Sequence, residues 1–123
     1  MNNKTPFIWH ELVTPDEEKS GEFYCKLLGW NIRKVDAGEY GIYTIFQKDN
    51  NDIAGMMNPT HETPKSNAFW HSYIEVDNID ICVGKVTELG GKILVKTHIV
   101  EDVGKICMLE DPAGASVYLM EPV

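Results

Sequence analysis

The side chains that could carry acid–base or metal chemistry are few and widely spaced along this chain. It contains four histidines, and His10 and His71 each directly follow a tryptophan. Glu75 follows His71 by four residues, and a histidine beside a carboxylate can exchange protons near neutral pH. Residues four apart on a strand are roughly 13 Å apart, so no direct relay is expected here. His61 and His98 lie in polar segments, where exposed loop histidines are expected.

The cysteines indicate neither a disulfide scaffold nor a zinc knuckle. Cys25, Cys82 and Cys107 are an odd number of residues without a short C-x-x-C spacing. Each lies in an apolar stretch, where a free cysteine behaves as a small hydrophobe. A reducing compartment fits this usage best. The chain also has no secretory signal pattern and no apolar run of about 20 residues, so we expect a cytoplasmic protein.

Length, composition and charge restrict the function further. The 123 residues predict one domain, 1–123, and 43% apolar with 24% charged residues is typical of a globular chain. Nineteen acidic and eleven basic residues give a net charge of −8. Because nucleic acids and anionic membranes require positive charge on their partners, neither is an expected partner. A small molecule is the expected ligand.

An internal repeat organises the chain. Trp9-His10 aligns with Trp70-His71, an offset of 61 (70 − 9), and Leu28-Gly29 aligns with Leu89-Gly90 at the same offset. Such a self-match indicates two copies of one structural unit. We place the copies at 6–57 and 68–121. The segment 58–67 between them is polar, carries two prolines and is predicted to be a linker.

Each copy predicts the order strand, helix and three strands. The helices are expected to begin at the capping residues Thr14 and Asp77. Phe23, Tyr24, Leu27 and Leu28 would form the apolar stripe of the first helix. Gly29 and Gly90 are expected to end the helices. The predicted strands cover 7–13, 30–35, 40–48 and 53–57 in the first copy, and 69–76, 92–95, 104–109 and 115–120 in the second. The fold class is therefore α+β, with two βαβββ modules.

This pattern resembles the vicinal oxygen chelate superfamily, which includes glyoxalase I, bleomycin resistance proteins and extradiol dioxygenases. The resemblance lies in four segments, distributed over nearly the whole chain. These are the Trp-His-Glu-Leu-Val-Thr-Pro-Asp segment ending at Asp16, the Phe-Tyr…Leu-Leu-Gly-Trp segment ending at Trp30, the Ala-Gly-Met-Met segment ending at Met57, and the Asp-Pro-Ala-Gly turn ending at Gly114. The resemblance implies a curved mixed sheet that encloses a cleft between the modules, with the helices outside. It also implies frequent pairing as homodimers, which we expect here.

In the metal-dependent members of this superfamily, ligands come from the first and last strands of each module. The resemblance places these positions at His71 and Tyr118 in the second copy. In the first copy they fall on Met57 and on either His10 or, after a slip of one residue, Trp9. Alternation groups Trp9 with Glu11 on one face of this strand and His10 with Leu12 on the other, and it leaves open which face meets the helix. If Leu12 packs under the helix, Trp9 and Glu11 face the cleft and His10 is a partly buried structural histidine. Tyrosine and methionine are unusual ligands for a hard divalent cation. We therefore expect no metal and no other cofactor; were a metal bound, His71 and then His10 would be its ligands.

Without a metal, the predicted cleft becomes a pocket for an organic ligand. The candidate ligand-binding residues are aromatic, sulfur-containing or polar, and they alternate along the predicted strands; they are Trp9, Glu11, Tyr43, Phe46, Met57, His71, Tyr73, Glu75, Cys107 and Tyr118. Such a set suits a flat, largely apolar molecule, and the acidic balance favours a cationic one. A bleomycin-resistance-like binding protein is the main hypothesis. There are two alternatives. One is a metal-dependent lyase, isomerase or dioxygenase. The other is a domain whose cleft is filled by its own side chains and whose surface mainly mediates assembly with other protein chains.

Overall fold

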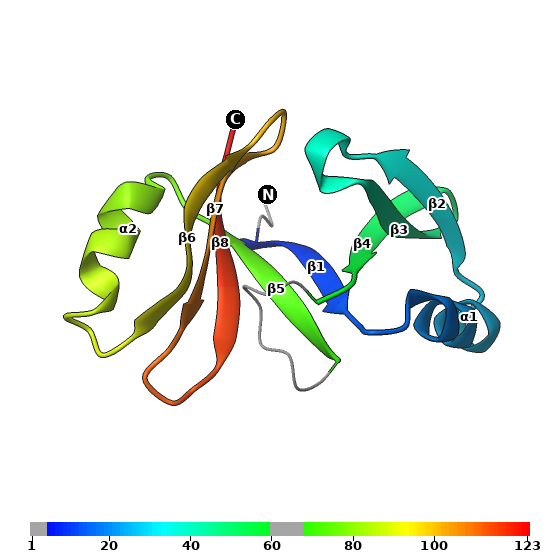
Figure 1. Cartoon of the computed structure of the whole chain (residues 1–123), viewed down its shortest axis with the longest axis horizontal. Helices are drawn as coiled ribbons and strands as arrows, with labels where there is room; N and C mark the ends of the chain where they lie inside the picture. The colour runs from blue at the N-terminus through cyan, green and yellow to red at the C-terminus, as the bar shows by residue number, and fades with distance from the viewer. Residues whose placement is uncertain (1–4, 60–67) are drawn as a thin grey trace. The chain divides into compact units, whose positions relative to one another are not determined.

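A computed structural model describes residues 5–59 and 68–123. The chain divides into two compact units (Figure 1). The first unit is Trp9–Trp70, and the second unit combines Met1–Ile8 with His71–Val123. Most of the predicted linker at 58–67, with His61, lies outside the described residues. Among the residues that are described, no helix is long and apolar enough to cross a membrane.

The described part of the first unit contains one α-helix, one short 3-10 helix and four strands. In chain order these are β1 (Phe7–Val13), α1 (Glu17–Leu28), β2 (Asn31–Asp36), the short 3-10 helix η1 (Gly38–Tyr40), β3 (Ile42–Lys48) and β4 (Asn51–Met57). The strands are ordered β2-β3-β4-β1. β1 pairs with β4 in parallel, whereas β3 pairs antiparallel with both β2 and β4, so the sheet is mixed.

The second unit repeats this order. It contains β5 (Phe69–Glu75), α2 (Ile79–Val86), β6 (Lys92–Val100), β7 (Gly104–Glu110) and β8 (Ser116–Pro122). The strand order is β5-β8-β7-β6, with β5 and β8 parallel and the other pairs antiparallel. The predicted fold class, α+β with two βαβββ modules and mixed pairing, is confirmed. β1 and β5 each begin in one compact unit and continue in the other, so the unit boundaries differ from those of the predicted modules.

Both helix starts lie later than predicted. Asp16 caps α1 by accepting a hydrogen bond from the backbone N–H of Lys19 at 2.9 Å, and Asn78 caps α2 in the same way through Ile81 at 3.1 Å. Thr14 instead accepts the backbone N–H of Asp16 at 3.2 Å, so it orders the turn that precedes the cap. The prediction for the end of α1 was correct, because Gly29 adopts the left-handed conformation with φ of 74°. α2 ends at Val86, before Gly90.

The core of the first unit lies between α1 and the sheet. Leu12, Phe46, Ala54 and Met56 form its buried centre, with Tyr24, Trp30 and Ile53 packed around them. The helix approaches the sheet at the buried Gly21. A Cβ there would lie 2.9 Å from Ile32 Cδ1 and 3.3 Å from Met56 Cε.

The predicted apolar stripe of α1 is correct at Tyr24, which packs against the core, and wrong at Phe23, Leu27 and Leu28, which are exposed. Phe23 and Leu27 are 57% and 62% exposed, although their spacing is helical. The side of α1 that faces the sheet is set by Glu17, whose carboxylate accepts the Thr44 hydroxyl at 2.9 Å, and by Gly21 and Tyr24. Phe23 and Leu27 are rotated away from that line, since successive residues on a helix are separated by about 100°.

The core of the second unit has the corresponding position beneath α2. Ile79, Cys107 and Leu119 are buried there, and Ile74, Val76, Cys82, Val83 and Leu109 pack against them. Leu12 on β1 and Ile74 on β5 are therefore equivalent, because each points toward the helix of its own unit. Their separation is 62 residues (74 − 12), one more than the offset found in the sequence.

The number of residues that separates equivalent positions in the two units increases further along the chain. Glu11 pairs with Gly55 across β1 and β4, and Tyr73 pairs with Tyr118 across β5 and β8. Glu11 and Tyr73 again differ by 62, whereas Gly55 and Tyr118 differ by 63 (118 − 55). Irregularities in the pairing of β6 with β7 accompany this shift. The constant offset of 61 is thus incorrect, and the counterpart of Tyr118 is Gly55 rather than Met57.

Candidate functional site

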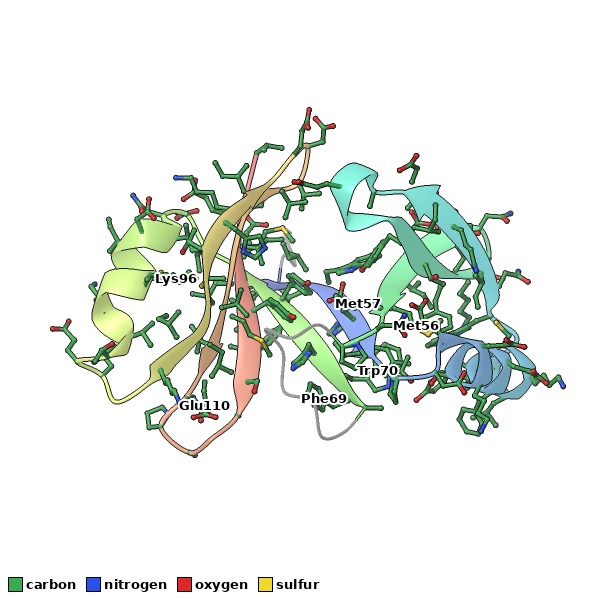
Figure 2. The ribbon with its side chains drawn as sticks, in the orientation of Figure 1. Met56, Met57, Phe69, Trp70, Lys96 and Glu110 are labelled. Carbon is green, nitrogen blue, oxygen red and sulfur yellow. The ribbon has the colours of Figure 1, made fainter. Side chains whose placement is uncertain are left out.

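Each unit presents one sheet face that points away from its own helix, which we call the helix-distal face. Leu12 belongs to the core beneath α1, so alternation along β1 puts Trp9 and Glu11 on the helix-distal face of the first unit. Met56 and Met57 are neighbours on β4 (Figure 2). Met56 is 2% exposed in the core beneath α1, and Met57 is half-buried on the helix-distal face.

A chain of hydrogen bonds connects three side chains on this face. The indole Nε1–H of Trp9 donates to the Tyr43 hydroxyl at 3.2 Å, and that hydroxyl donates to Glu11 Oε2 at 2.6 Å. Glu11 is 3% exposed, whereas Trp9 and Tyr43 are half-buried. Because an indole only donates hydrogen bonds and the Tyr43 hydroxyl gives its proton to Glu11, both bonds point toward Glu11. We call these residues the Trp9–Tyr43–Glu11 chain.

Gly55 provides the space that this arrangement requires. A Cβ built on Gly55 would lie 1.5 Å from Tyr43 Oη and 2.3 Å from Tyr43 Cζ. The tyrosine ring therefore crosses β4 directly over the glycine and reaches Glu11, the register partner of Gly55 on β1. The sequence analysis included Gly55 only in the Ala-Gly-Met-Met segment of the resemblance and gave it no role in the site. The available signal was a glycine inside a predicted strand, which often marks a close approach by another group.

The helix-distal face of the second unit is aromatic. Tyr73 and Tyr118 stack with ring centroids 4.4 Å apart and planes 6° apart, and His71 meets Tyr118 edge-on at 5.3 Å. All three are buried, at 3% to 6% exposure. Burial disfavours the charged imidazolium and lowers the pKa of His71 below its usual value. His71 is therefore in its neutral form at pH 7.

Two of the predicted ligand-binding residues belong to the cores instead. Phe46 is fully buried beneath α1, and Cys107 is fully buried beneath α2. Both predictions are wrong, because these residues alternate with the helix-distal positions on β3 and β7. Burial raises the pKa of the Cys107 thiol, which is consistent with an unreactive core residue.

Two further predicted residues lie at the margin of these faces. Glu75 is exposed at the end of β5. His10 is exposed as well, and not the partly buried histidine expected if Trp9 faced away from the helix. His10 alternates with Glu11, so it does not share the helix-distal face of β1.

The donor set does not fit the metal that the resemblance implied. The register places Trp9 and Gly55 at the two ligand positions of the first unit, and His71 and Tyr118 at those of the second. At Gly55, where a carboxylate side chain would begin, the Tyr43 hydroxyl already occupies the space. Across residues 5–59 and 68–123, no three His, Cys, Asp or Glu side chains are grouped as a metal site would require.

The fold and these faces define a class of protein with two βαβββ modules, each offering an aromatic and polar sheet face opposite its helix. A comparison with family models identifies that class. Residues 7–119 match the glyoxalase/bleomycin resistance protein/dioxygenase superfamily. The chain belongs to this family.

Individual relatives share modest identity with the chain. "Putative glyoxylase CFP32" of Mycobacterium tuberculosis is 29% identical over 115 residues, which is 92% of this chain and 44% of that protein. The anthracycline biosynthesis protein DnrV of Streptomyces peucetius is 28% identical over 120 residues, again covering 44% of the relative. The chain therefore spans less than half the length of these relatives.

Solved structures agree on the fold. The crystal structure of methylmalonyl-CoA epimerase from Mycobacterium tuberculosis matches the whole chain with a TM-score of 0.62 at 15% identity, and 93% of that chain is covered. At this level of identity the match extends to the fold and not to the activity.

Proposed function

We propose that this chain binds a small, flat organic molecule on a helix-distal face, without the metal of its metal-dependent relatives. The observation that carries the proposal is the arrangement around Glu11. Two half-buried aromatic side chains, Trp9 and Tyr43, adjoin a buried carboxylate that orients them through hydrogen bonds. Aromatic walls with a few fixed polar groups are typical of small-molecule sites.

The chemistry of one relative supports the same class of ligand. DnrV is named for the biosynthesis of anthracyclines, which are polycyclic aromatic compounds. Stacking on Trp9 and Tyr43 would accommodate a ligand of that shape. Gly55 keeps β4 free of a side chain beneath the Tyr43 ring, so the ring can remain against the sheet.

A metal-independent binding site predicts a specific pattern of affinities. Acridine, a flat and neutral aromatic probe, can be titrated into the intact chain and followed by its fluorescence. We expect Trp9→Leu to weaken acridine binding at least tenfold. Trp70→Leu is the matched control, because Trp70 packs with Tyr24 and Phe46 on the helix side of the first unit, and it should leave the affinity unchanged.

The same titration tests whether binding of acridine depends on a metal ion. Protein purified without a histidine tag should hold no stoichiometric divalent ion, and acridine affinity should be the same with and without a chelator. Equal affinity in wild type and Trp9→Leu would overturn the proposed site. About one ion per chain, with binding that the chelator abolishes and Zn²⁺ or Ni²⁺ restores, would replace the proposal with a metal-dependent enzyme.

A lyase- or isomerase-like enzyme is the second candidate. The name of the mycobacterial relative points to glyoxylase activity, and the neutral His71 could accept a proton. Turnover of an α-oxoaldehyde thiol adduct that is lost in His71→Gln would support it.

A further inference from the structure

The outward side of α1 carries large apolar side chains that the fold of the first unit leaves exposed. Phe23 is 57% exposed and Leu27 is 62% exposed. They are four residues apart, so they are neighbours on one side of the helix. The Phe23 ring meets the Tyr24 ring edge-on with centroids 5.1 Å apart, and Tyr24 packs against the core. This contact restrains the Phe23 ring, so a partner that covers it orders little that was free before.

A pair of charges lies alongside these two apolar residues. Glu22 and Lys26 are also four apart and form an ion pair of 2.6 Å. The hydrogen bond and charge of Lys26 lower the pKa of Glu22, and Glu22 raises the pKa of Lys26, so both are charged at pH 7. One shallow depression on the helix surface is lined by Lys19, Glu22, Phe23, Lys26 and Leu27. Such a depression between helical side chains can receive a side chain from a second helix.

A second copy of α1 complements this surface when it runs in the antiparallel direction. A two-fold axis beside Cys25, midway between Phe23 and Leu27, places Phe23 of each helix against Leu27 of the other. The charged flanks of the two helices then adjoin on the same side. Lys26 lies two residues, or about 3 Å along the axis, from Glu22 of the second copy. Each helix thus provides one member of each of two ion pairs between the copies.

The charge pattern favours the antiparallel pair over a parallel one. In a parallel pair the charged flank of each helix adjoins the opposite flank of the other, so Glu22 does not meet Lys26. Antiparallel helices also place Lys19 near the C-terminal end of the second helix, where a cation is stabilised. We infer that the outward side of α1 is an interface at which two copies of this chain associate as an antiparallel helix pair. The inference is independent of the proposed ligand site, because this side of α1 faces away from the sheet.

The interface is small, so its association is reversible and can be measured. One pair of 12-residue helices covers less area than a standard interface, and we expect a dissociation constant on the order of 10 µM. Sedimentation velocity over a hundredfold range of concentration should show the mean mass doubling. A mass that does not change with concentration would overturn the inference.

Substitution of the apolar residues tests the position of the interface. Phe23→Glu and Leu27→Glu each place two charges in a symmetric interface, and each should raise the dissociation constant at least tenfold. Ile81→Glu is the matched control, because Ile81 is 58% exposed on the other helix, α2. It should leave the dissociation constant unchanged. Equal effects of all three substitutions would show that exposed apolar residues associate without a specific interface, and the inference would fail.

Charge reversal tests the antiparallel pairing itself. Glu22→Lys makes the flank of α1 positive, and Lys26→Glu makes it negative. Each variant alone should associate at least fivefold more weakly than wild type, whereas an equimolar mixture of the two should recover the wild-type affinity. Both chains in the mixture have lost the ion pair within the helix, so the recovery can come only from contacts between chains. A mixture that associates as weakly as its components would overturn the inference.

A further control separates this pairing from the net charge of the chain. Glu88→Lys makes the same change as Glu22→Lys on an exposed residue of the second unit. Because a smaller net negative charge reduces self-repulsion, net charge alone would make both variants associate more tightly. We expect only Glu22→Lys to weaken association, and equal weakening by both would overturn the inference. Circular dichroism checks that each variant folds; should Phe23→Glu fold poorly, Leu27→Glu and the charge reversals still decide the outcome.

Discussion

The two units place different chemistry on equivalent pairs of strands. In the first unit, Glu11 lies opposite Gly55, and a tyrosine from the third strand crosses the glycine to reach the carboxylate. In the second unit, Tyr73 lies opposite Tyr118, and the two rings stack on each other. One face is thus organised by directional hydrogen bonds around a buried carboxyl group. The other is organised by ring packing.

This difference shows that, in a repeated fold, the residues that pack beneath the helices can stay similar while the residues of the helix-distal faces diverge. The helix-side cores keep apolar residues at equivalent positions, such as Leu12 and Ile74, because each must pack beneath a helix. The helix-distal faces carry no such requirement. One copy can therefore lose the side chain at its last strand, as at Gly55, while the other keeps a large one.

The largest expected effect comes from filling the space at Gly55. In Gly55→Ala the new Cβ would collide with Tyr43, and forcing extra volume into a packed site typically costs about 1–3 kcal/mol. Chemical denaturation measures the change in the free energy of unfolding. In a Tyr43→Ala background, the same substitution should cost much less.

A control for the glycine experiment lies on α2. A Cβ at Gly84 would meet no atom within 4 Å, so Gly84→Ala should stabilise the helix by about 0.5–1 kcal/mol. A Gly55→Ala penalty that is unchanged in the Tyr43→Ala background would show that Tyr43 is not the residue for which Gly55 makes room.

The tyrosine stack of the second unit should contribute less. Tyr118→Phe keeps the ring and Tyr118→Leu removes it, so the two variants isolate the aromatic contact with Tyr73. An aromatic pair contributes about 0.5–1.5 kcal/mol beyond its buried area. We expect Tyr118→Leu to be less stable than Tyr118→Phe by at least that amount in urea unfolding. Equal stabilities would mean that this face is not held together by ring packing.

Much of the fold could be predicted from the sequence because its signals are local. Strand propensity, turn residues and the helix-ending Gly29 each act over a few residues, and the repeat extends them to the second copy. The exposure of Phe23 and Leu27 could not be predicted in this way. Which side of α1 meets the sheet depends on Gly21 and on the Thr44–Glu17 hydrogen bond, which are contacts between distant segments.

The candidate site was less predictable for the same reason. Alternation along β1 correctly grouped Trp9 with Glu11, but it left open which set faces the helix; the burial of Leu12 answers that question. The constant offset led to Met57 because it carried no information about the irregular pairing of β6 with β7. Gly55 was missed because a residue without a side chain has a role only through the ring placed above it.

The smallest effect is a dependence of the stability of the second unit on pH. Burial lowers the pKa of His71 in the folded state below its ordinary value of 6.5, so the unfolded chain binds this proton at a higher pH than the folded chain does. His71 therefore costs no stability above about pH 6.5 and destabilises the fold as the pH falls below that value. Thermal unfolding between pH 7.5 and 5 should give a falling Tm.

His71→Gln removes this titration while keeping a polar side chain of similar size, so the Tm of the variant should fall less steeply over the same interval. Equal slopes for wild type and His71→Gln would mean that His71 becomes protonated in the folded protein as readily as in the unfolded chain, and that its burial does not produce the pH dependence of stability.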